Sequence, residues 1–416
     1  MNTVIKIRTY FDSPVEILVG KLRDPCPKNA YEVCRRELGL ECVTLSNARL
    51  DHDFCVVRPG TATHLVELGL MLLATTAANA SNSSLFSSPP ERLGSGSKLR
   101  AIRPPGIKAV TLDASGIPLP ELEDPQWGLR AIGALDCGYT GKDVRVCVID
   151  TGLNILHPDL LKVDEAHRRS FVGDATVMGR HAGHGTRCAG IVGGKAPPAQ
   201  SPRYSVAPDA ELFVAKVMGE DGITQEAIIS AIGWAVDNKC SVVSMSLGDE
   251  FPLTMVSSRT MEAVASQALD KGTLIVAGAG NDSLRPADPR PVDHPANCDS
   301  IMAVAAIDHT MKVASYSNAG PPGGTPKVDI AGPGISRSAS FPTLYRTEAG
   351  TSIATPFVAG VAALYKEAFP KATARELWKL LVNNARKLPN QSERDLGAGL
   401  VQAPQRSDAV ALSSAF

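Results

Sequence analysis

The segment of this chain with the clearest capacity for chemistry is residues 350–360, GTSIATPFVAG. Small residues precede an apolar run with a proline one turn inside, which predicts a helix whose first turn carries Ser352. A serine hydroxyl there lies among unpaired backbone N–H groups, which favour negative charge on an attacked carbonyl. Because serine before an apolar run is more often an ordinary helix cap, Ser352 needs a base and an orienting group elsewhere.

Two residues are candidates for those roles. Asp150 directly follows the apolar stretch 144–149, and a carboxylate at the end of a parallel strand lies where ligands bind. His184 stands between two glycines that lead into a helix of small residues, although a histidine satisfied within the core is the simpler alternative. His181 forms an H-x-x-H pattern with it, but no acidic third ligand follows, so we expect no metal there.

Asn281 is a candidate for a fourth role. It follows the predicted strand 273–277 and the glycine-rich residues Gly278, Ala279 and Gly280. A side-chain amide after such a strand end can direct its N–H₂ group at an oxyanion. A turn-forming asparagine is the usual explanation for this kind of residue, so Asn281 needs the other candidates beside it.

Apolar strands alternating with helices must position these groups. Strands are expected at 144–149, 212–217, 242–246, 273–277, 301–307 and 328–331, and helices at 224–237, 257–269 and 372–384. This alternation predicts an α/β fold, a doubly wound and mostly parallel sheet with helices on both faces.

The chain is expected to fall into four segments. Residues 1–80 read as a small α+β domain with strands at 3–11, 15–22, 41–45 and 54–57 and helices near 30–38 and 62–78. Residues 81–125 are rich in Pro, Ser and Gly and read as a linker. The α/β domain is expected over 126–405, followed by a tail over 406–416.

Charge and composition restrict the partners. The chain has 42 Lys and Arg against 43 Asp and Glu, a net charge of −1, so no basic field indicates nucleic acid or an anionic membrane. The N-terminus alternates polar and apolar residues unlike a signal peptide, and the apolar stretch 64–80 is too short to span a bilayer. We therefore expect a cytoplasmic protein, with leaderless export left open.

Nine cysteines occur at irregular positions without any C-x-x-C pair, which favours free thiols in a reducing compartment. A zinc site among the four cysteines of residues 26–55 is the alternative, but their spacing matches no common zinc pattern.

Taken together, the motifs around Asp150, His184, Asn281 and Ser352 resemble those of the subtilisin-like serine proteases, in that family's order along the chain. The resemblance runs over about residues 126–401. It implies that Ser352 is the nucleophile, that His184 moves its proton and that Asp150 fixes the imidazole tautomer. It also implies that Asn281 and the Ser352 backbone N–H hold the oxyanion, in peptide-bond hydrolysis through an acyl-enzyme.

The resemblance further implies an extended peptide or protein substrate that pairs with the chain by backbone hydrogen bonds. The residues assigned to that substrate are Ser246, Leu247, Gly248, Gly222, Ile223, Gly278, Ala279 and Gly280.

The loop near residue 293 is expected to determine which side chain the site accepts before the scissile bond. Asp293 falls where proprotein convertases of the family carry aspartate and many digestive-type members carry glycine, and Asp282 lies near the pocket rim. Two carboxylates there favour Lys or Arg before the scissile bond. Arg285 or Arg290 neutralising Asp293 within the loop remains the alternative.

No cofactor is expected, and calcium is left open. Asp159 resembles a calcium ligand of the family, but the loop 193–205 lacks the oxygen ligands that such a site needs.

The N-terminal domain has the place and rough size of the family's propeptide, which occupies the cleft until the precursor processes itself. A permanent module that recruits a partner is the alternative. Two rival functions remain for the whole chain: a narrow processing protease for one partner protein, and a catalytically silent, peptide-binding pseudoprotease.

Overall fold

The computed structural model describes residues 42–45, 54–57, 122–173, 176–179, 181–195, 202–219, 222–248, 259–321, 327–341 and 343–406. The chain divides into two units, Met1–Lys108 and Ala109–Phe416. In the first unit, strands β1 (Cys42–Leu45) and β2 (Phe54–Val57) pair antiparallel, close to two of the strands predicted there. The other elements predicted for residues 1–80, most of the linker and all but the first residue of the tail lie outside the described residues.

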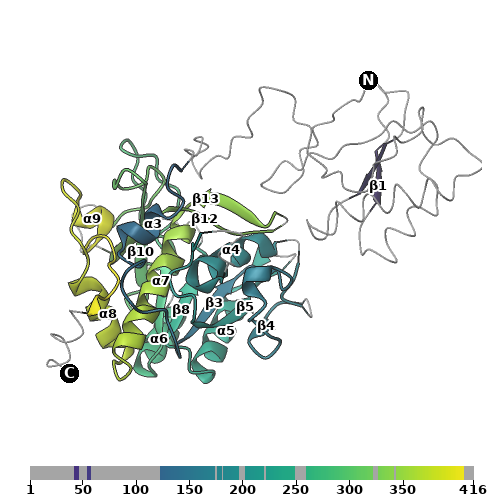
Figure 1. Ribbon diagram of the computed structural model, residues 1–416, viewed down its shortest axis with the longest axis horizontal. Coiled ribbons are helices and arrows are strands. Elements are labelled where there is room, and N and C mark those ends of the chain that lie inside the picture. Colours follow the sequence, from purple (N-terminus) through teal and green to yellow (C-terminus); the bar gives the residue numbers. More distant parts are fainter. Residues whose placement is uncertain are drawn as a thin grey trace, which may run out of the picture. The chain divides into compact units, whose positions relative to one another are not determined.

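The second unit is built on a seven-stranded parallel sheet in the order β11-β10-β9-β8-β3-β5-β4 (Figure 1). Its strands are β3 (Arg145–Asp150), β4 (Arg168–Ser170), β5 (Glu211–Lys216), β8 (Val242–Met245), β9 (Leu274–Gly278), β10 (Met302–Ile307) and β11 (Ile330–Pro333). The strands predicted from the sequence are confirmed to within about two residues, the usual uncertainty of element ends. β4 was not predicted.

The chain changes its direction of winding at β3, which pairs with β5 on one side and β8 on the other. The carboxyl end of β3 is therefore a topological switch point, the place where open α/β sheets bind ligands. Asp150 is the last residue of this strand.

Two groups of helices surround the sheet (Figure 1). Helix α4 (Ala182–Gly193) contacts α7 (Thr351–Ala368), and α7 packs along β8, β9, β10 and β11. Helices α5 (Gln225–Asp237) and α6 (Arg259–Asp270) contact each other and the sheet, with α8 (Ala374–Asn383) beside α6. The predicted α/β class is confirmed.

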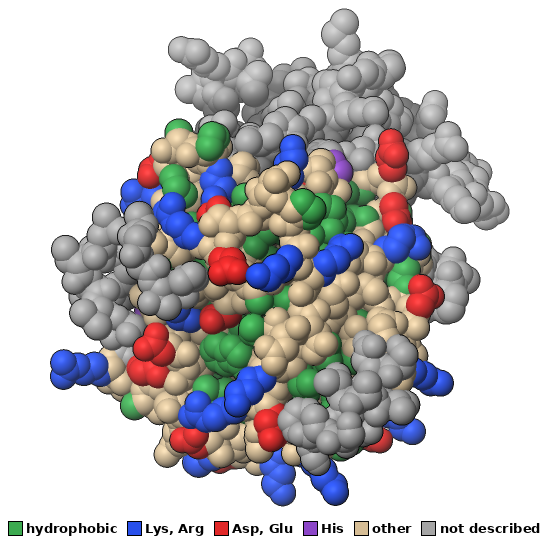
Figure 2. All heavy atoms as spheres, turned by 90° about the vertical axis from the view of Figure 1, so that its left-hand side faces the viewer, with side chains coloured by type: hydrophobic (Ala, Val, Ile, Leu, Met, Phe, Trp, Pro, Cys, Tyr) green, Lys and Arg blue, Asp and Glu red, His purple; other side chains and the backbone are tan. Residues whose placement is uncertain are grey.

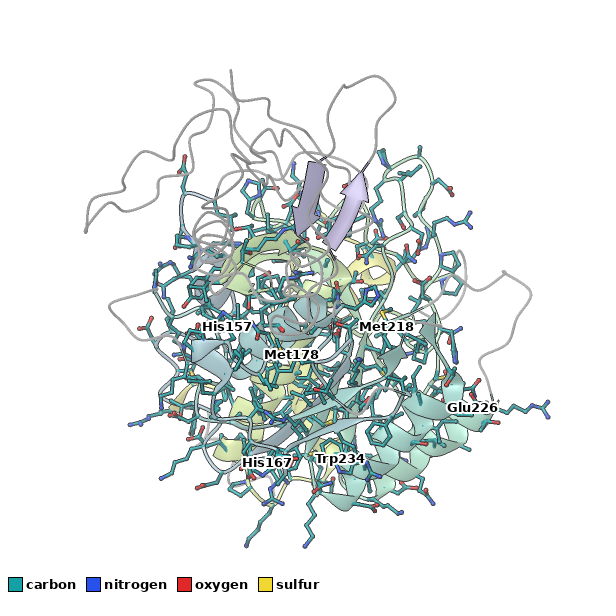
Figure 3. The ribbon with its side chains drawn as sticks, turned by 90° about the vertical axis from the view of Figure 1, so that its right-hand side faces the viewer. His157, His167, Met178, Met218, Glu226 and Trp234 are labelled. Atoms are coloured by element: carbon teal, nitrogen blue, oxygen red, sulfur yellow. The ribbon has the colours of Figure 1, made fainter. Side chains whose placement is uncertain are left out.

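The strand β5 is anchored by aromatic contacts. Phe213 meets the ring of Trp234 on α5 at a centroid distance of 5.6 Å and the ring of His167 at 4.5 Å, both edge to face. Figure 3 labels His167 and Trp234 at this end of the sheet. Such pairs add to the burial of a large aromatic residue.

A short hairpin precedes the serine helix and was not predicted. Strands β12 (Ile335–Ala339) and β13 (Tyr345–Ala349) pair antiparallel, and β13 leads directly into Gly350 and α7. Shorter elements are α3 (Trp127–Ala131), η1 (Pro158–Leu160), β6 (Met218–Gly219), β7 (Gly222–Ile223) and α9 (Glu393–Leu396).

The described surface mixes both signs of charge. Figure 2 shows Lys and Arg side chains interspersed with Asp and Glu over the face in view. Among the described residues, no helix combines the length and apolarity needed to cross a membrane. The described cysteines outside the first unit are buried free thiols: Cys137, Cys147, Cys188, Cys240 and Cys298.

Candidate active site

Asp150 and His184 form a hydrogen-bonded pair at the switch point. Nδ1 of His184 lies 2.8 Å from Oδ1 of Asp150, which also accepts the backbone N–H of Thr151 at 2.7 Å. The Asp150 side chain is 1% exposed, whereas that of His184 is 31% exposed. This pair joins the start of α4 to the end of β3. A Cβ at Gly185 would lie 2.1 Å from the carbonyl oxygen of Gly152, so this close approach requires glycine.

The two groups shift each other's pKa. Burial lowers the pKa of the His184 imidazole, but the charge and hydrogen bond of Asp150, together with the contacts to Cys188, outweigh burial and raise the pKa well above 6.5. Burial raises the pKa of the Asp150 carboxyl, yet the charge and hydrogen bond of His184 bring it below 3.8. Both shifts favour a carboxylate facing an imidazolium, the charge state formed when the histidine takes a proton.

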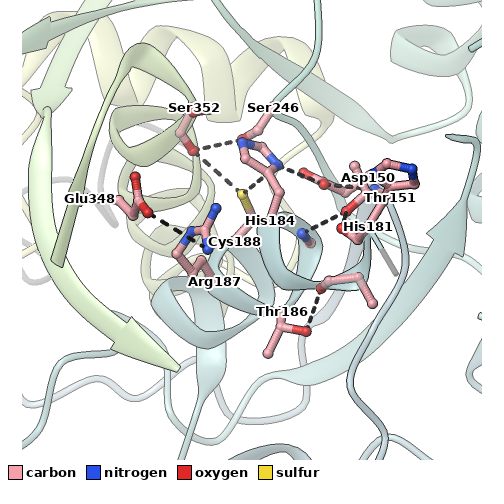
Figure 4. A network of polar contacts seen from close by, with 12 residues as sticks. Asp150, Thr151, His181, His184, Thr186, Arg187, Cys188, Ser246, Glu348 and Ser352 are labelled. Atoms are coloured by element: carbon pink, nitrogen blue, oxygen red, sulfur yellow. Dashed lines mark hydrogen bonds and ion pairs between the residues drawn. The ribbon is translucent and has the colours of Figure 1, made fainter. Parts of the chain in front are cut away.

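Ser352 is the second residue of α7, and its carbonyl is held from outside the helix. Pro356 has no N–H to donate to the carbonyl four residues earlier. The Ser352 carbonyl instead accepts from Ser246 Oγ at 2.9 Å and from Cys188 Sγ at 3.5 Å. Cys188 Sγ also lies 3.8 Å from Nδ1 of His184, so His184 and Ser352 meet around one thiol (Figure 4).

Asn281 is tied to the first residue of the same helix. Its Oδ1 accepts the backbone N–H of Thr351 at 2.8 Å and the Thr351 hydroxyl at 3.1 Å. These two contacts at Oδ1 fix the orientation of the Asn281 amide group. A Cβ at Gly350 would lie 3.0 Å from Ser352 Oγ and 3.7 Å from Asn281 Oδ1, so the three residues are neighbours.

The segments expected to pair with substrate both follow parallel strands. Ser246, Leu247 and Gly248 follow β8, and the hairpin of β6 and β7, which contains Gly222 and Ile223, follows β5. Carboxyl ends of parallel strands share one edge of a sheet, so both segments lie at the edge that carries Asp150. The Ser246 hydroxyl donates to the Ser352 carbonyl at 2.9 Å and so ties the end of β8 to the start of α7.

Asp293 packs against two of the glycines assigned to substrate binding. A Cβ at Gly280 would be 2.2 Å from Asp293 Oδ2, and a Cβ at Gly248 would be 3.3 Å from its Cβ, so the carboxyl group packs between these two glycines. Its side chain is buried. Arg285, one of the two candidates for neutralising it, pairs with Asp395 at 2.8 Å.

The residues around Asp159 do not fit a calcium ion. The buried carboxylate accepts the Tyr204 hydroxyl at 2.6 Å and the Tyr345 hydroxyl at 3.0 Å on the same oxygen, and the Tyr345 hydroxyl also lies 3.2 Å from the other oxygen. Hydroxyl hydrogens directed at a carboxylate occupy the lone pairs that a cation would use. Tyr204 itself belongs to the loop that the family resemblance assigns to calcium.

Within the described residues, Asp150, His184 and Cys188 form the one group that offers three metal-ligand atoms within 4.8 Å of one another. Two ligands on a tetrahedral zinc would stand about 3.3 Å apart, given bonds of about 2.0–2.1 Å. The 2.8 Å between His184 Nδ1 and Asp150 Oδ1 is instead a hydrogen-bond distance. The arrangement is that of a proton-transfer site.

Two residues at the site were not assigned from the sequence. Thr351 holds Asn281, and Asn318 contacts both Asp293 and Asp282. The start of the serine helix pointed to Thr351 only as a cap, and Asn318 carried no motif.

Comparisons with known proteins agree with this geometry. A model of the subtilase family matches residues 141–399. The chain is 33% identical over 304 residues to a thermostable alkaline protease of Halalkalibacterium halodurans, covering 72% of this chain and 77% of that protein. The solved structure of sphericase superposes with a TM-score of 0.56 at 27% identity, covering 68% of this chain and 99% of that one.

The expected cytoplasmic location is wrong. The chain is 31% identical over 286 residues to the minor extracellular protease Epr of Bacillus subtilis, covering 67% of this chain and 41% of that protein. A relative named as extracellular contradicts the location inferred from the N-terminal sequence. That inference rested on the lack of a recognisable apolar leader, which is a weak observation.

Proposed function

The chain belongs to the subtilase family of serine endopeptidases, and from this premise we propose that Ser352 is its nucleophile and His184 its general base. The hydroxyl of Ser352 attacks the scissile carbonyl while Nε2 of His184 takes its proton. The same nitrogen then gives the proton to the leaving amine, and water hydrolyses the acyl-enzyme. Asp150 keeps the other proton on Nδ1 and stabilises the imidazolium. The 2.8 Å contact between Asp150 and His184 is the observation that carries this proposal.

Asn281 is the proposed side-chain donor to the oxyanion. Its Oδ1 is held by Thr351, and its amide nitrogen is thereby presented beside the N-terminus of α7. The backbone N–H of Ser352 supplies a second donor, and the helix dipole adds to it. Losing the Asn281 amide would reduce kcat by about 10²–10³-fold.

We propose that the enzyme works best at alkaline pH. Catalysis needs neutral His184, and Asp150 holds the pKa of this imidazole well above 6.5. Activity should therefore rise with pH until the imidazolium has lost its proton. The name of the relative described as an alkaline protease supports the same direction.

The proposed preference is for Lys or Arg before the scissile bond. Asp293 packs between Gly248 and Gly280, the two glycines that the family resemblance assigns to the walls of the pocket. A cationic side chain entering there would meet this buried carboxylate, and opposite charges attract strongly where water is largely excluded.

The proposed precursor carries residues 1–80 as an inhibitory prodomain, cut within the linker 81–125. The division of the chain into units at Lys108 and Ala109 supports a separable N-terminal part. Arg103 and Lys108 are linker residues that a basic-selective enzyme would cut.

The testing experiment compares the wild type with Ser352→Ala, measuring intact mass and cleavage of a peptide library. Loss of the N-terminal region by the wild type alone, with cleavage after Lys or Arg, is the expected result. Cleavage after apolar residues would reject the Asp293 pocket and leave the protease assignment standing. A stable and fully active full-length chain would reject the prodomain. Equal activity of Ser352→Ala would reject the nucleophile, and casein cleavage separates a general from a narrow protease.

A further inference from the structure

Asn318 is a buried amide that the proposed mechanism does not yet use. It lies between β10 and β11 along the chain and is 0% exposed. Its side chain makes four polar contacts at 3.0–3.2 Å, and its backbone N–H makes a fifth at 3.1 Å. A buried amide with this many partners fixes the relative positions of the groups that it contacts.

The first set of contacts brackets Asn281. The backbone N–H of Asn318 donates to the carbonyl of Gly280 at 3.1 Å, and its Oδ1 accepts the backbone N–H of Asp282 at 3.0 Å. Both neighbours of Asn281 are therefore tied to one residue. The direction in which the Asn281 side chain leaves the backbone depends on these two peptide groups.

The second set of contacts reaches the pocket carboxylates. Nδ2 of Asn318 lies 3.1 Å from Oδ1 of Asp293 and 3.2 Å from Oδ2 of Asp282. These are the two acidic residues that the sequence placed at the floor and rim of the specificity pocket. One amide group thus donates to both, and hydrogen bonds to ionised acceptors are the stronger kind.

Gly280 shows how tightly these groups are packed. Its φ is +108°, and a Cβ there would lie 2.2 Å from Asp293 Oδ2 and 2.3 Å from Asn318 Nδ2. The residue before Asn281 therefore contacts both the pocket carboxylate and the amide that holds it. A displacement of either group would be transmitted to Asn281.

We propose that Asn318 is a positioning residue that couples the specificity pocket to the oxyanion donor, so that a cationic side chain docked on Asp293 finds Asn281 already in place. The inference rests on the proposed function, because it takes Asn281 as the oxyanion donor and Asp293 as the contact for Lys or Arg. Asn318 touches neither the substrate nor the reacting atoms. Its effect is on kcat through Asn281 and on substrate preference through Asp293.

The effect on kcat is tested with a double-mutant cycle on a peptide with a neutral residue before the scissile bond. Asn318→Ala should lower kcat by about tenfold, while KM changes little, as expected for a group whose effect appears only in the transition state. Combined with Asn281→Ala, it should cause no further loss, because its effect passes through Asn281. Multiplicative losses in the double variant would overturn the coupling.

The effect on preference is tested with Asn318→Asp, which keeps an oxygen for the Asp282 N–H and replaces the donor by a third carboxylate. Clustered carboxylates hold protons at higher pH. We compare kcat/KM for an arginine peptide with kcat/KM for a norleucine peptide. As the pH is lowered, this ratio should begin to fall at a higher pH in the variant than in the wild type. An unchanged pH profile would overturn this part. Because its oxygen keeps the turn, this variant remains informative if Asn318→Ala does not fold.

Asn384→Ala and Asn384→Asp are the matched controls. Asn384 is partly buried, and its Nδ2 donates to the Leu380 carbonyl at the end of α8, a helix that carries none of the candidate site residues. Its variants should lose thermal stability without changing kcat or the arginine preference. If Asn318→Ala behaves in the same way, Asn318 is merely structural. If Asn281→Ala alone keeps the wild-type kcat, the assignment of Asn281 as oxyanion donor is wrong. This outcome is distinct from a failure of the proposed coupling through Asn318.

Discussion

Asp150 and Asp159 are two buried aspartates with a histidine beside each, and they are built in opposite ways. Asp150 is 1% exposed, and its Oδ2 has no hydrogen-bond partner among the described residues. Asp159 is 2% exposed, and both of its oxygens accept tyrosine hydroxyls. The two carboxylates are therefore equally buried. Among the described residues, however, only Asp159 has hydrogen-bond partners on both side-chain oxygens.

The histidines differ in the same sense. His157 is fully buried, with Nε2 donating to the Leu344 carbonyl at 2.6 Å and Nδ1 accepting the Asp159 N–H at 3.2 Å. These two contacts fix the tautomer of the ring. Within the described part of the chain, His184 is held at Nδ1 alone, and its side chain is partly exposed. A histidine that must move protons needs one nitrogen open to the substrate, whereas a structural histidine has both nitrogens satisfied.

Replacing Asp150 should have the largest effect. In Asp150→Asn the amide cannot keep the proton on Nδ1 of His184, so we expect kcat to fall by about 10⁴-fold. KM should change little, because no substrate contact is removed. Steady-state kinetics on a peptide substrate measure both quantities. A loss smaller than about tenfold would mean that Asp150 is as structural as Asp159.

The pH profile should move in the same variant. Asp150 holds the pKa of His184 above 6.5, and neutral His184 is the base, so wild-type kcat/KM should rise as pH rises through that raised value. Without the carboxylate charge, the acid limb should shift down by about one pH unit or more. The residual activity of Asp150→Asn, measured between about pH 5 and 10, tests this. If the acid limb of the pH profile does not shift, its pKa belongs to a group other than His184.

Asp159→Asn should lower the stability of the protein and leave kcat nearly unchanged, the reverse of what we expect for Asp150→Asn. Two tyrosine hydroxyls lose a charged acceptor, so we expect the free energy of unfolding to fall by about 2–3 kcal/mol. The catalytic groups keep their contacts, so kcat of the folded fraction should stay within a few-fold of the wild type. Urea unfolding and active-site titration separate the two quantities. A fall in kcat as large as in Asp150→Asn would abolish the distinction between the two aspartates.

The sequence predicted the strands of the large sheet except β4, because buried parallel strands are nearly continuous apolar runs and can be recognised without tertiary information, whereas β4 consists of Arg168, Arg169 and Ser170. It did not predict the hairpin of β12 and β13, whose Ser, Arg and Thr residues break any alternation. That hairpin contributes Tyr345 to the Asp159 cluster. Nothing local distinguishes a carboxylate that binds two hydroxyls from one that binds calcium.

The candidate site shows the same limit. Asp150, His184, Asn281 and Ser352 were identified because each lies in a short motif at the end of a strand or the start of a helix. Asn318 was missed because its partners lie 25 and 36 residues away, and its function depends on tertiary contacts alone. Motifs therefore locate groups at element ends, and supporting residues require the fold.

Tyr345→Phe should cause the smallest change, which is a change in how the free energy of unfolding depends on pH. Burial is the larger cause and the Asp159 carboxylate the smaller one, and together they raise the pKa of Tyr345 to about 12. The same two causes raise the pKa of the Tyr204 hydroxyl. An unfolded phenol titrates near about pH 10, so the unfolded chain loses its proton first. The stability from this hydrogen bond is present below about pH 10 and is lost as pH rises toward 12. Tyr345→Phe should cost about 1 kcal/mol at neutral pH and flatten this alkaline decline, as followed by urea unfolding. An alkaline decline that persists in the double variant with Tyr204→Phe would place it outside the Asp159 cluster.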